Sequence, residues 1–232
     1  NYRAVQEVID NLGSNHNLSL IRLGNVRKCI FVEGKDIKIL SKFQNIVHPE
    51  NSLSLDQFPT VELGGWSRFD EALGAARLFF EETKGEIKTY CILDRDYHSD
   101  TEIAELYRKA GENHLNLHVW KRKEIENYIL TPQSVFKLTG LDSSQFDEFL
   151  TCLYNKLDVL REEVLSGIMD RMATQDKSKT PSYFLKAAEE ILNLKWNTME
   201  GRLSLANGKS LISTINTWIH EEYKRNCSMA KL

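Results

Sequence analysis

The segment EIKTYCILDRDYHSD, residues 86 to 100, joins an apolar run to a pair of aspartates. The run ends at Asp94, and Asp96 follows after a single arginine. Its β-branched, aromatic and apolar side chains are typical of a buried strand. Side chains two apart on a strand point to the same side, so the two carboxylates would face one volume if the strand continued through them. Because like charges held close together repel unless a cation compensates, the pair indicates either a solvated turn or a metal site.

The same type of apolar run occurs four times between residues 28 and 120, and each run is followed by a segment with helical spacing. The four runs are KCIFVEG (28–34), TVELGGW (60–66), EIKTYCILD (86–94) and LNLHVW (115–120). Strands that alternate with helices form a parallel sheet with helices on both faces. The predicted fold class is therefore α/β, with a Rossmann-like parallel sheet flanked by helices. Ser99 and Glu102 are predicted to form a capping box for the helix after the third strand, which would stop near Gly111.

Helical patterns alone occupy residues 132 to about 200, interrupted by the polar loop DRMATQDKSKTPSY (170–183). We therefore predict four segments. They are an N-terminal helix or linker at 1–24, a sheet core at 25–131, an α-helical insertion or subdomain at 132–200, and a C-terminal helix at 201–232 that completes the sheet domain. Since the chain starts with Asn1 inside a helix-like stretch, the first segment is expected to continue from a preceding region of a longer polypeptide.

Composition excludes several classes of protein. The 232 residues are 41% hydrophobic and 27% charged, as in globular proteins rather than disordered or membrane chains. No apolar stretch approaches the roughly 20 residues needed to span a bilayer, and the first residues do not have the pattern of a signal peptide. Four cysteines without a CxxC pair fit a reducing compartment, so we expect a cytoplasmic protein with no membrane contact. A net charge of -3 means that nucleic-acid binding would need local basic clusters or bound cations.

Acidic residues follow three of the four predicted strands, at the edge of a parallel sheet where ligands bind. They are Glu33 after the first strand, Asp94 and Asp96 after the third, and Glu124 and Glu126 after the fourth. Carboxylate oxygens are the ligands that Mg²⁺ and Mn²⁺ prefer. Each acid alone would ordinarily belong to a solvated turn or a charged helix face. Their agreement favours a divalent-metal site.

FVEGKD (31–36) and ILDRD (92–96) resemble the Toprim signature, a glutamate after the first strand and Asp-x-Asp after the third. This family includes topoisomerases, primases and the OLD (overcoming lysogenization defect) nucleases. LGGWSRFDEALGAARLF (63–79), KRKEIENYIL (121–130) and NGK (207–209) are similar to the OLD-type Toprim nuclease at the C-terminus of ABC-type ATPases in bacterial anti-phage systems, and to related stand-alone nucleases. The resemblance makes residues 25–131 the Toprim catalytic core, completed by the terminal stretch.

The resemblance also implies roles for individual residues. The implied catalytic set is Glu33, Asp94, Asp96, Glu126 and Lys209, in which the four acids hold metal and the lysine is catalytic. Glu124 is a less direct candidate ligand. Many relatives carry a second acid four residues after the first glutamate, where this chain has Ile37. Asp36 lies one position early, so it would bind metal only if the turn differs in length.

The implied chemistry is hydrolysis of a phosphodiester at a two-metal site that holds Mg²⁺ or Mn²⁺. ANGKSL (206–211) places Lys209 at a helix start, where backbone N–H groups and the helix dipole also favour an anion. Lys121, Arg122 and Lys123 are predicted either to bind nucleic-acid phosphates or to be solvated charges. His98 is either a group that supports the site, a base, or a surface histidine in a polar loop.

Three functional hypotheses follow. The leading one is a DNA nuclease that acts in anti-phage defence under the control of an ABC-type ATPase, on this or another chain, through which it could form a homodimer. The second keeps the site but cleaves RNA such as tRNA. The third is a degenerate Toprim that serves as a docking or assembly module, against which the complete set of acids and lysine argues. The sequence contains no Walker motif, so we expect no ATP hydrolysis by this chain alone.

Overall fold

The computed structural model describes residues 21–34, 36–50 and 54–225. Most of the predicted N-terminal segment, residues 1–20, lies outside these ranges, as do residues 226–232 with Cys227. The chain divides into two compact units, which we call the sheet unit (Asn1–Leu93 and Ser99–Val119) and the helical unit (Asp94–His98 and Trp120–Leu232). No helix within the described ranges is long and apolar enough to cross a membrane.

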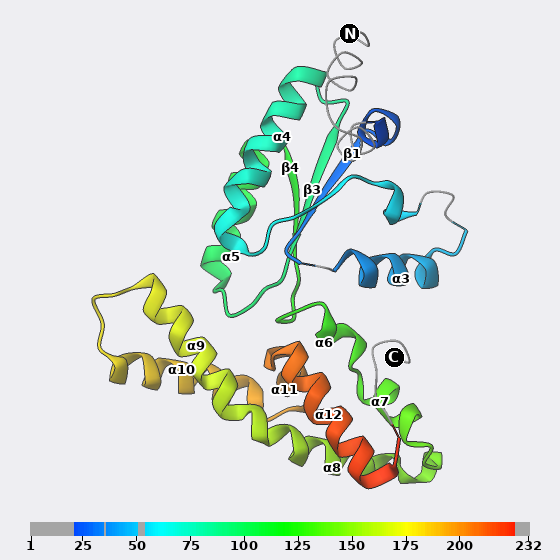
Figure 1. Cartoon of the computed structure of the whole chain (residues 1–232). Helices are drawn as coiled ribbons and strands as arrows, with labels where there is room; N and C mark the ends of the chain where they lie inside the picture. Colours follow the sequence, from blue (N-terminus) through cyan, green and yellow to red (C-terminus); the bar gives the residue numbers. More distant parts are fainter. Residues whose placement is uncertain (1–20, 35, 51–53, 226–232) are drawn as a thin grey trace. The chain divides into compact units, whose positions relative to one another are not determined.

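The sheet unit contains four parallel strands in the order β2-β1-β3-β4, of which Figure 1 labels β1, β3 and β4. Their bounds are Lys28–Val32 for β1, Thr60–Glu62 for β2, Lys88–Leu93 for β3 and Leu115–Val119 for β4. In the register, Val32 of β1 pairs with Ile92 of β3, and Leu93 pairs with Val119 of β4. The carboxyl ends of these three strands therefore meet at one edge, and the predicted α/β class with a parallel sheet flanked by helices is confirmed.

Three helices connect the strands: α3 (Ile37–Val47), α4 (Phe69–Thr83) and α5 (Asp100–Glu112). Residues 21–26, before β1, are also helical. The predicted capping box of α5 is confirmed, because Ser99 Oγ accepts from the Glu102 N–H and the Glu102 carboxylate accepts from the Ser99 N–H. The helix ends at Glu112, one residue beyond the predicted stop near Gly111.

Helices α4 and α5 cover one face of the sheet (Figure 1). Alternate residues of the central strands, such as Phe31 and Cys91, point into this layer, where Ala72 and Ala76 of α4 pack against them. Small side chains on α4 let the helix approach the strands closely, and the two-residue period of the strands sends the intervening side chains to the other face. The sheet core thus fixes where each strand ends.

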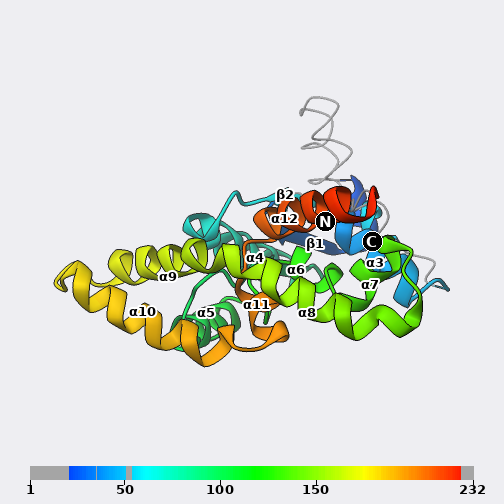
Figure 2. The same ribbon diagram turned by 90° about the horizontal axis from the view of Figure 1, so that it is seen from below.

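The helical unit contains α6 (Glu126–Ile129), α7 (Pro132–Thr139), α8 (Phe146–Leu157), α9 (Arg161–Gln175), α10 (Pro181–Trp196), α11 (Met199–Leu205) and α12 (Gly208–Tyr223). Helices α9 and α10 pack side by side, as Figure 2 shows. Leu211, Ile215 and Trp218 of α12 belong to the same buried cluster as Phe149 of α8 and Leu192 of α10.

This packing divides the chain differently from the predicted segments. The sequence placed residues 120–131 and the last helix with the sheet, whereas both belong to the helical unit. The physical reason is the apolar stripe of α12, which is buried against other helices rather than against strands. Asp94–His98 also belongs to the helical unit, although the segment leaves directly from β3.

Candidate active site

Asp94 and Asp96 lie in a loop and not on a continued strand. Strand β3 ends at Leu93, and Asp96 adopts the left-handed backbone conformation with a φ of 47°. Aspartate tolerates this conformation better than most residues because its short polar side chain can hydrogen-bond locally. The condition for strand alternation to aim both carboxylates at one volume, a strand that continues through them, is therefore not met. A turn sets the direction of these side chains.

Hydrogen bonds that involve backbone groups tie the loop to other parts of the helical unit. The Asp96 N–H donates to the Lys123 carbonyl at 3.0 Å, and the Ile125 N–H donates to Asp94 Oδ1 at 3.1 Å. The Tyr97 hydroxyl donates to the Leu205 carbonyl at 3.0 Å. Together these bonds bring Asp94 and Asp96 beside residues 123–126, the segment that carries the other predicted acids.

Tyr97 is also held by a glycine of α9. A Cβ atom added at Gly167 would lie 2.3 Å from Cε2 of Tyr97, which is far inside van der Waals contact. The ring therefore packs directly on the helix backbone, and only glycine leaves room for it. A cavity of about 400 Å³ adjoins this contact and is lined by Tyr97, Lys123, Glu163, Ser166, Gly167, Asp170 and Asn207. Neither Tyr97 nor Gly167 was singled out from the sequence, because their contact joins distant segments.

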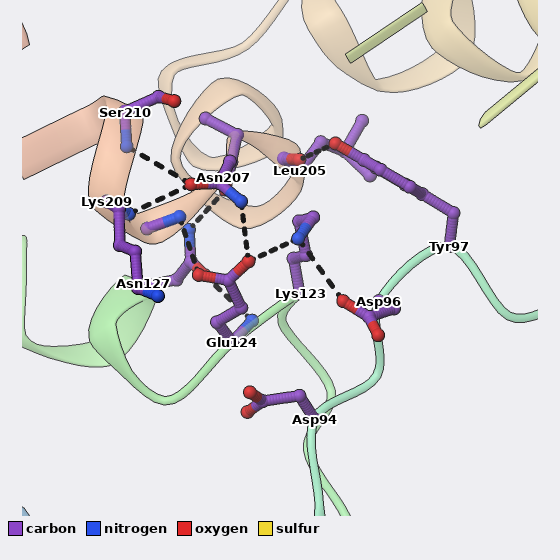
Figure 3. Close-up of polar contacts among 12 residues, drawn as sticks. Asp94, Asp96, Tyr97, Lys123, Glu124, Asn127, Leu205, Asn207, Lys209 and Ser210 are labelled. Atoms are coloured by element: carbon purple, nitrogen blue, oxygen red, sulfur yellow. Dashed lines mark hydrogen bonds and ion pairs between the residues drawn. The ribbon is translucent and has the colours of Figure 1, made fainter. Parts of the chain in front are cut away.

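A buried lysine connects the two groups of acids (Figure 3). The side chain of Lys123 is 6% exposed, and its Nζ donates to Asp96 Oδ1 at 3.2 Å and to Glu124 Oε1. Burial lowers the pKa of Lys123, but the charges and hydrogen bonds of Glu124 and Asp96 more than offset this, so the pKa lies above its ordinary value. Lys123 is therefore a charged internal cation, whereas the sequence predicted either a contact to nucleic-acid phosphates or a solvated charge.

Arg122 and Lys121, the other two residues of the predicted basic cluster, differ in the exposure of their side chains. Arg122 is engaged within the helical unit, where its guanidinium contacts Glu200 at 2.8 Å, donates to the Asn127 carbonyl and lies 5.0 Å from the centre of the Tyr128 ring. The Lys121 side chain is exposed. Of the predicted basic cluster, Lys121 is thus the residue best placed to meet a polyanion.

Glu124 is a buried carboxylate whose oxygens are engaged by protein donors. The residue is 8% exposed, and besides Lys123 it accepts from Asn207 Nδ2 at 3.0 Å and from the Gly208 N–H at 2.8 Å. Glu126 is the first residue of α6 and lies against the same glycine, since a Cβ added at Gly208 would lie 2.7 Å from Glu126 Cβ. Because both of its oxygens are engaged by protein donors, Glu124 is a poor candidate for a metal ligand.

Lys209 lies in the first turn of α12, with an exposed side chain. The N–H groups of Lys209 and Ser210 both donate to Oδ1 of Asn207, the N-cap residue, at 3.1 Å. The helix start was expected to favour an external anion, but its N–H groups are satisfied by Asn207 and Glu124. Any role of Lys209 must therefore come from its ammonium group.

Glu33 and Asp36 belong to the sheet unit. Glu33 directly follows Val32, whose partner in β3 is Ile92, so it lies at the carboxyl edge of the sheet. The pKa of the Cys91 thiol is raised to about 12, mainly by burial and further by the charge of Glu33. Asp36 directly precedes α3. Hydrogen bonds thus join the segments that carry Asp94, Asp96, Glu124, Glu126 and Lys209 in the helical unit, whereas Glu33 and Asp36 lie in the sheet unit.

His98 is buried, with 8% of the residue exposed. Burial, together with the positive charge of Arg171, lowers its pKa to about 4, against the opposing effect of Asp96. The interpretation as a surface histidine in a polar loop was therefore wrong. The imidazole is neutral at physiological pH and supports the loop from within.

The residues fit a hard divalent cation by their chemistry, since Asp94, Asp96 and Glu126 all offer carboxylate oxygens. A carboxylate that accepts one bond from the protein keeps further lone pairs for a cation, and such bonds orient metal ligands. The bonds from Ile125 and Lys123 to Asp94 and Asp96 are of this kind. Within the described ranges, however, no three or more histidine, cysteine, aspartate or glutamate side chains are grouped so that they could hold a metal ion.

Comparison of the chain with models of protein families, with curated proteins and with solved structures found no match. The Toprim resemblance therefore stays a prediction from the sequence.

Proposed function

We propose that this chain is a metal-dependent endonuclease that hydrolyses phosphodiester bonds in DNA. One observation supports this function above the others. Three segments that carry motifs of the resemblance, residues 94–96, 123–126 and 207–209, are joined by hydrogen bonds into one cluster of acids and lysines. Clusters of this type are common at functional sites, where charged groups are held together at a cost in stability.

Each residue of the proposed site has a distinct task. Asp94, Asp96 and Glu126 of the helical unit would hold Mg²⁺ or Mn²⁺, and a role of Glu33 as a further ligand is implied by the resemblance alone. When bound, these ions supply an activated water and charge neutralisation at the scissile phosphate. The Lys209 ammonium would stabilise charge on the phosphate oxygens, and Lys121 would bind the neighbouring backbone phosphate.

The proposed setting comes from the resemblance alone. We place the chain in the cytoplasm as the effector of an anti-phage system, under the control of an ABC-type ATPase. Cys29, Cys91 and Cys152 are free thiols, which is compatible with a reducing compartment.

The test is cleavage by the purified protein, with and without its ATPase partner. Supercoiled plasmid, single-stranded DNA and tRNA are incubated with Mg²⁺ or Mn²⁺, and again with excess chelator. Nicking or linearisation of plasmid that stops with chelator is the expected result. Cleavage of tRNA alone would move the substrate class to RNA. Lack of cleavage of all three substrates, with the partner present, would contradict an enzymatic function and favour a docking module.

A further inference from the structure

The first turn of α12 is fixed by a carboxylate from a distant part of the chain. Glu124 Oε2 accepts from the Gly208 N–H, and Oε1 accepts from Asn207 Nδ2. Asn207 Oδ1 in turn accepts from the N–H groups of Lys209 and Ser210. The initial N–H groups of a helix have no partner within the helix. In α12 the N–H groups of Gly208, Lys209 and Ser210 are satisfied by the side chains of Glu124 and Asn207.

Positive charge on two sides of the Glu124 carboxylate strengthens its hydrogen bonds to the start of α12. The helix dipole places partial positive charge at the start of α12, next to the buried Glu124 carboxylate. On its other side, Glu124 accepts from the Lys123 ammonium, which also contacts Asp96. A continuous series of charge-assisted hydrogen bonds therefore runs from Asp96 through Lys123 and Glu124 to the helix that carries Lys209 (Figure 3).

The close approach of these segments depends on Gly208. A Cβ atom built there would lie 2.7 Å from Glu124 Oε2 and 2.7 Å from Glu126 Cβ. Any side chain at this position would push the first turn of α12 away from both acids. The residue type at 208 is therefore matched to the contact with Glu124.

We propose that Glu124 is a positioning residue that locks the first turn of α12, and with it Lys209, against the segment that follows β4. This inference rests on the proposed function, in which Lys209 acts on the scissile phosphate. It assigns Glu124 a role other than metal ligand, because both of its oxygens accept from protein donors.

Glu124→Gln tests the lock in the free protein, without metal or substrate. The amide keeps the shape of the side chain but sets an N–H donor against the donors at Gly208, Asn207 or Lys123. We expect amide hydrogen exchange in residues 208–212 to become at least about tenfold faster, with exchange in α8 unchanged. The matched control is Glu200→Gln, which removes an exposed carboxylate paired with Arg122 and should leave exchange at α12 unaltered. Unchanged exchange at 208–212 in Glu124→Gln would overturn the proposal.

Asn207→Ser provides a second variant, because Glu124→Gln removes a buried charge from an ion pair and could prevent folding. Serine keeps an oxygen for the N-cap but loses the Nδ2 donor to Glu124. Exchange at 208–212 should rise in the same direction and by a smaller factor. The equivalent change in another helix of the unit, Thr180→Ser at the N-cap of α10, is the control and should not affect α12. Equal exchange in Asn207→Ser and the parent would contradict the lock.

Cleavage kinetics separate positioning from metal binding. If Glu124 positions Lys209, Glu124→Gln should lower kcat by about 10–100-fold, with KM and the Mn²⁺ concentration for half-maximal activity unchanged. Weakened Mn²⁺ binding with normal exchange at α12 would make Glu124 a ligand and overturn the proposal. If the parent protein cleaves nothing, the proposed function fails, while the exchange measurement still decides whether the lock exists.

Discussion

At the scale of single residues, two substitutions of Asp94 distinguish its hydrogen bond within the protein from its proposed role as a metal ligand. Its Oδ1 accepts from the Ile125 N–H at 3.1 Å. Asp94→Asn keeps an acceptor oxygen and removes the charge, so the free energy of unfolding should stay within about 0.5 kcal/mol of the parent while cleavage falls to background. Asp94→Ala should also lose cleavage but should be less stable by about 0.5–1.5 kcal/mol, because the hydrogen bond is lost. Denaturant unfolding with chelator present, measured beside the cleavage rate, checks both variants. A parental rate in Asp94→Asn would remove Asp94 from the site.

Replacement of Lys209 should lower turnover without changing metal binding, because the proposed role of its ammonium group is at the phosphate and not at the metal. Its side chain is exposed, and the bonds that cap α12 come from its backbone N–H. In Lys209→Ala we expect kcat to fall by about 10²–10³-fold, the effect of losing one preorganised donor. Calorimetric Mn²⁺ titration should give an unchanged affinity, and stability should change by less than about 0.5 kcal/mol. The control is Lys195→Ala, an exposed lysine near the end of α10. Equal turnover in both variants would exclude Lys209 from catalysis.

At the scale of elements, helix α9 supports the loop with the aspartates through the contact of Gly167 with Tyr97. A methyl group at 167 would lie 2.3 Å from the ring, so Gly167→Ala must displace Tyr97 and weaken its bond to Leu205. We expect a loss of about 1–3 kcal/mol in stability, together with reduced cleavage. Gly74→Ala in α4 is the control, because a Cβ there has nothing within 4 Å. That variant should gain about 0.5–1 kcal/mol from helix propensity. Similar unfolding curves for the two variants would contradict the proposed support.

The same loop should make stability depend on pH through His98. Its pKa is lowered to about 4 in the folded protein, against an ordinary value of 6.5, so between these values the unfolded chain binds a proton that the native chain does not. This contribution to stability is complete above about pH 6.5 and is lost as pH falls towards 4. The difference in unfolding free energy between the parent and His98→Gln should shrink over this range by on the order of 1–3 kcal/mol. Unfolding measured at several pH values with chelator present tests this, and a constant difference would show that His98 titrates normally.

At the scale of the whole molecule, local patterns of sequence predicted the elements, but not how the segments meet. The four strands and the capping box at Ser99 followed from periodicity and residue type, which act over a few residues. The acids expected at the carboxyl ends of strands pointed to residues 94–96 and 123–126, two segments that hydrogen bonds join. The ion pairs of Lys123 did not follow, because "KRKE" has the same appearance on a solvated helix face and in a buried network. The bond between Glu124 and Gly208 joins residues 84 apart, a separation that no local pattern encodes. The position of α12 in the helical unit likewise depends on side-chain packing between distant segments, which local patterns do not show.

The central claim of the proposed function is that Asp94, Asp96 and Glu126 hold a divalent metal with which the chain hydrolyses DNA. The most direct test is cleavage of supercoiled plasmid under single-turnover conditions by the parent protein, Glu126→Gln and Glu200→Gln, over a range of Mn²⁺ concentrations. Both substitutions remove one carboxylate charge, but only Glu126 belongs to the proposed set of ligands. We predict cleavage that saturates with Mn²⁺ in the parent and in Glu200→Gln, and cleavage at the level of the chelator control in Glu126→Gln. Equal rates in all three proteins, or rates that do not change when chelator replaces Mn²⁺, would contradict the claim.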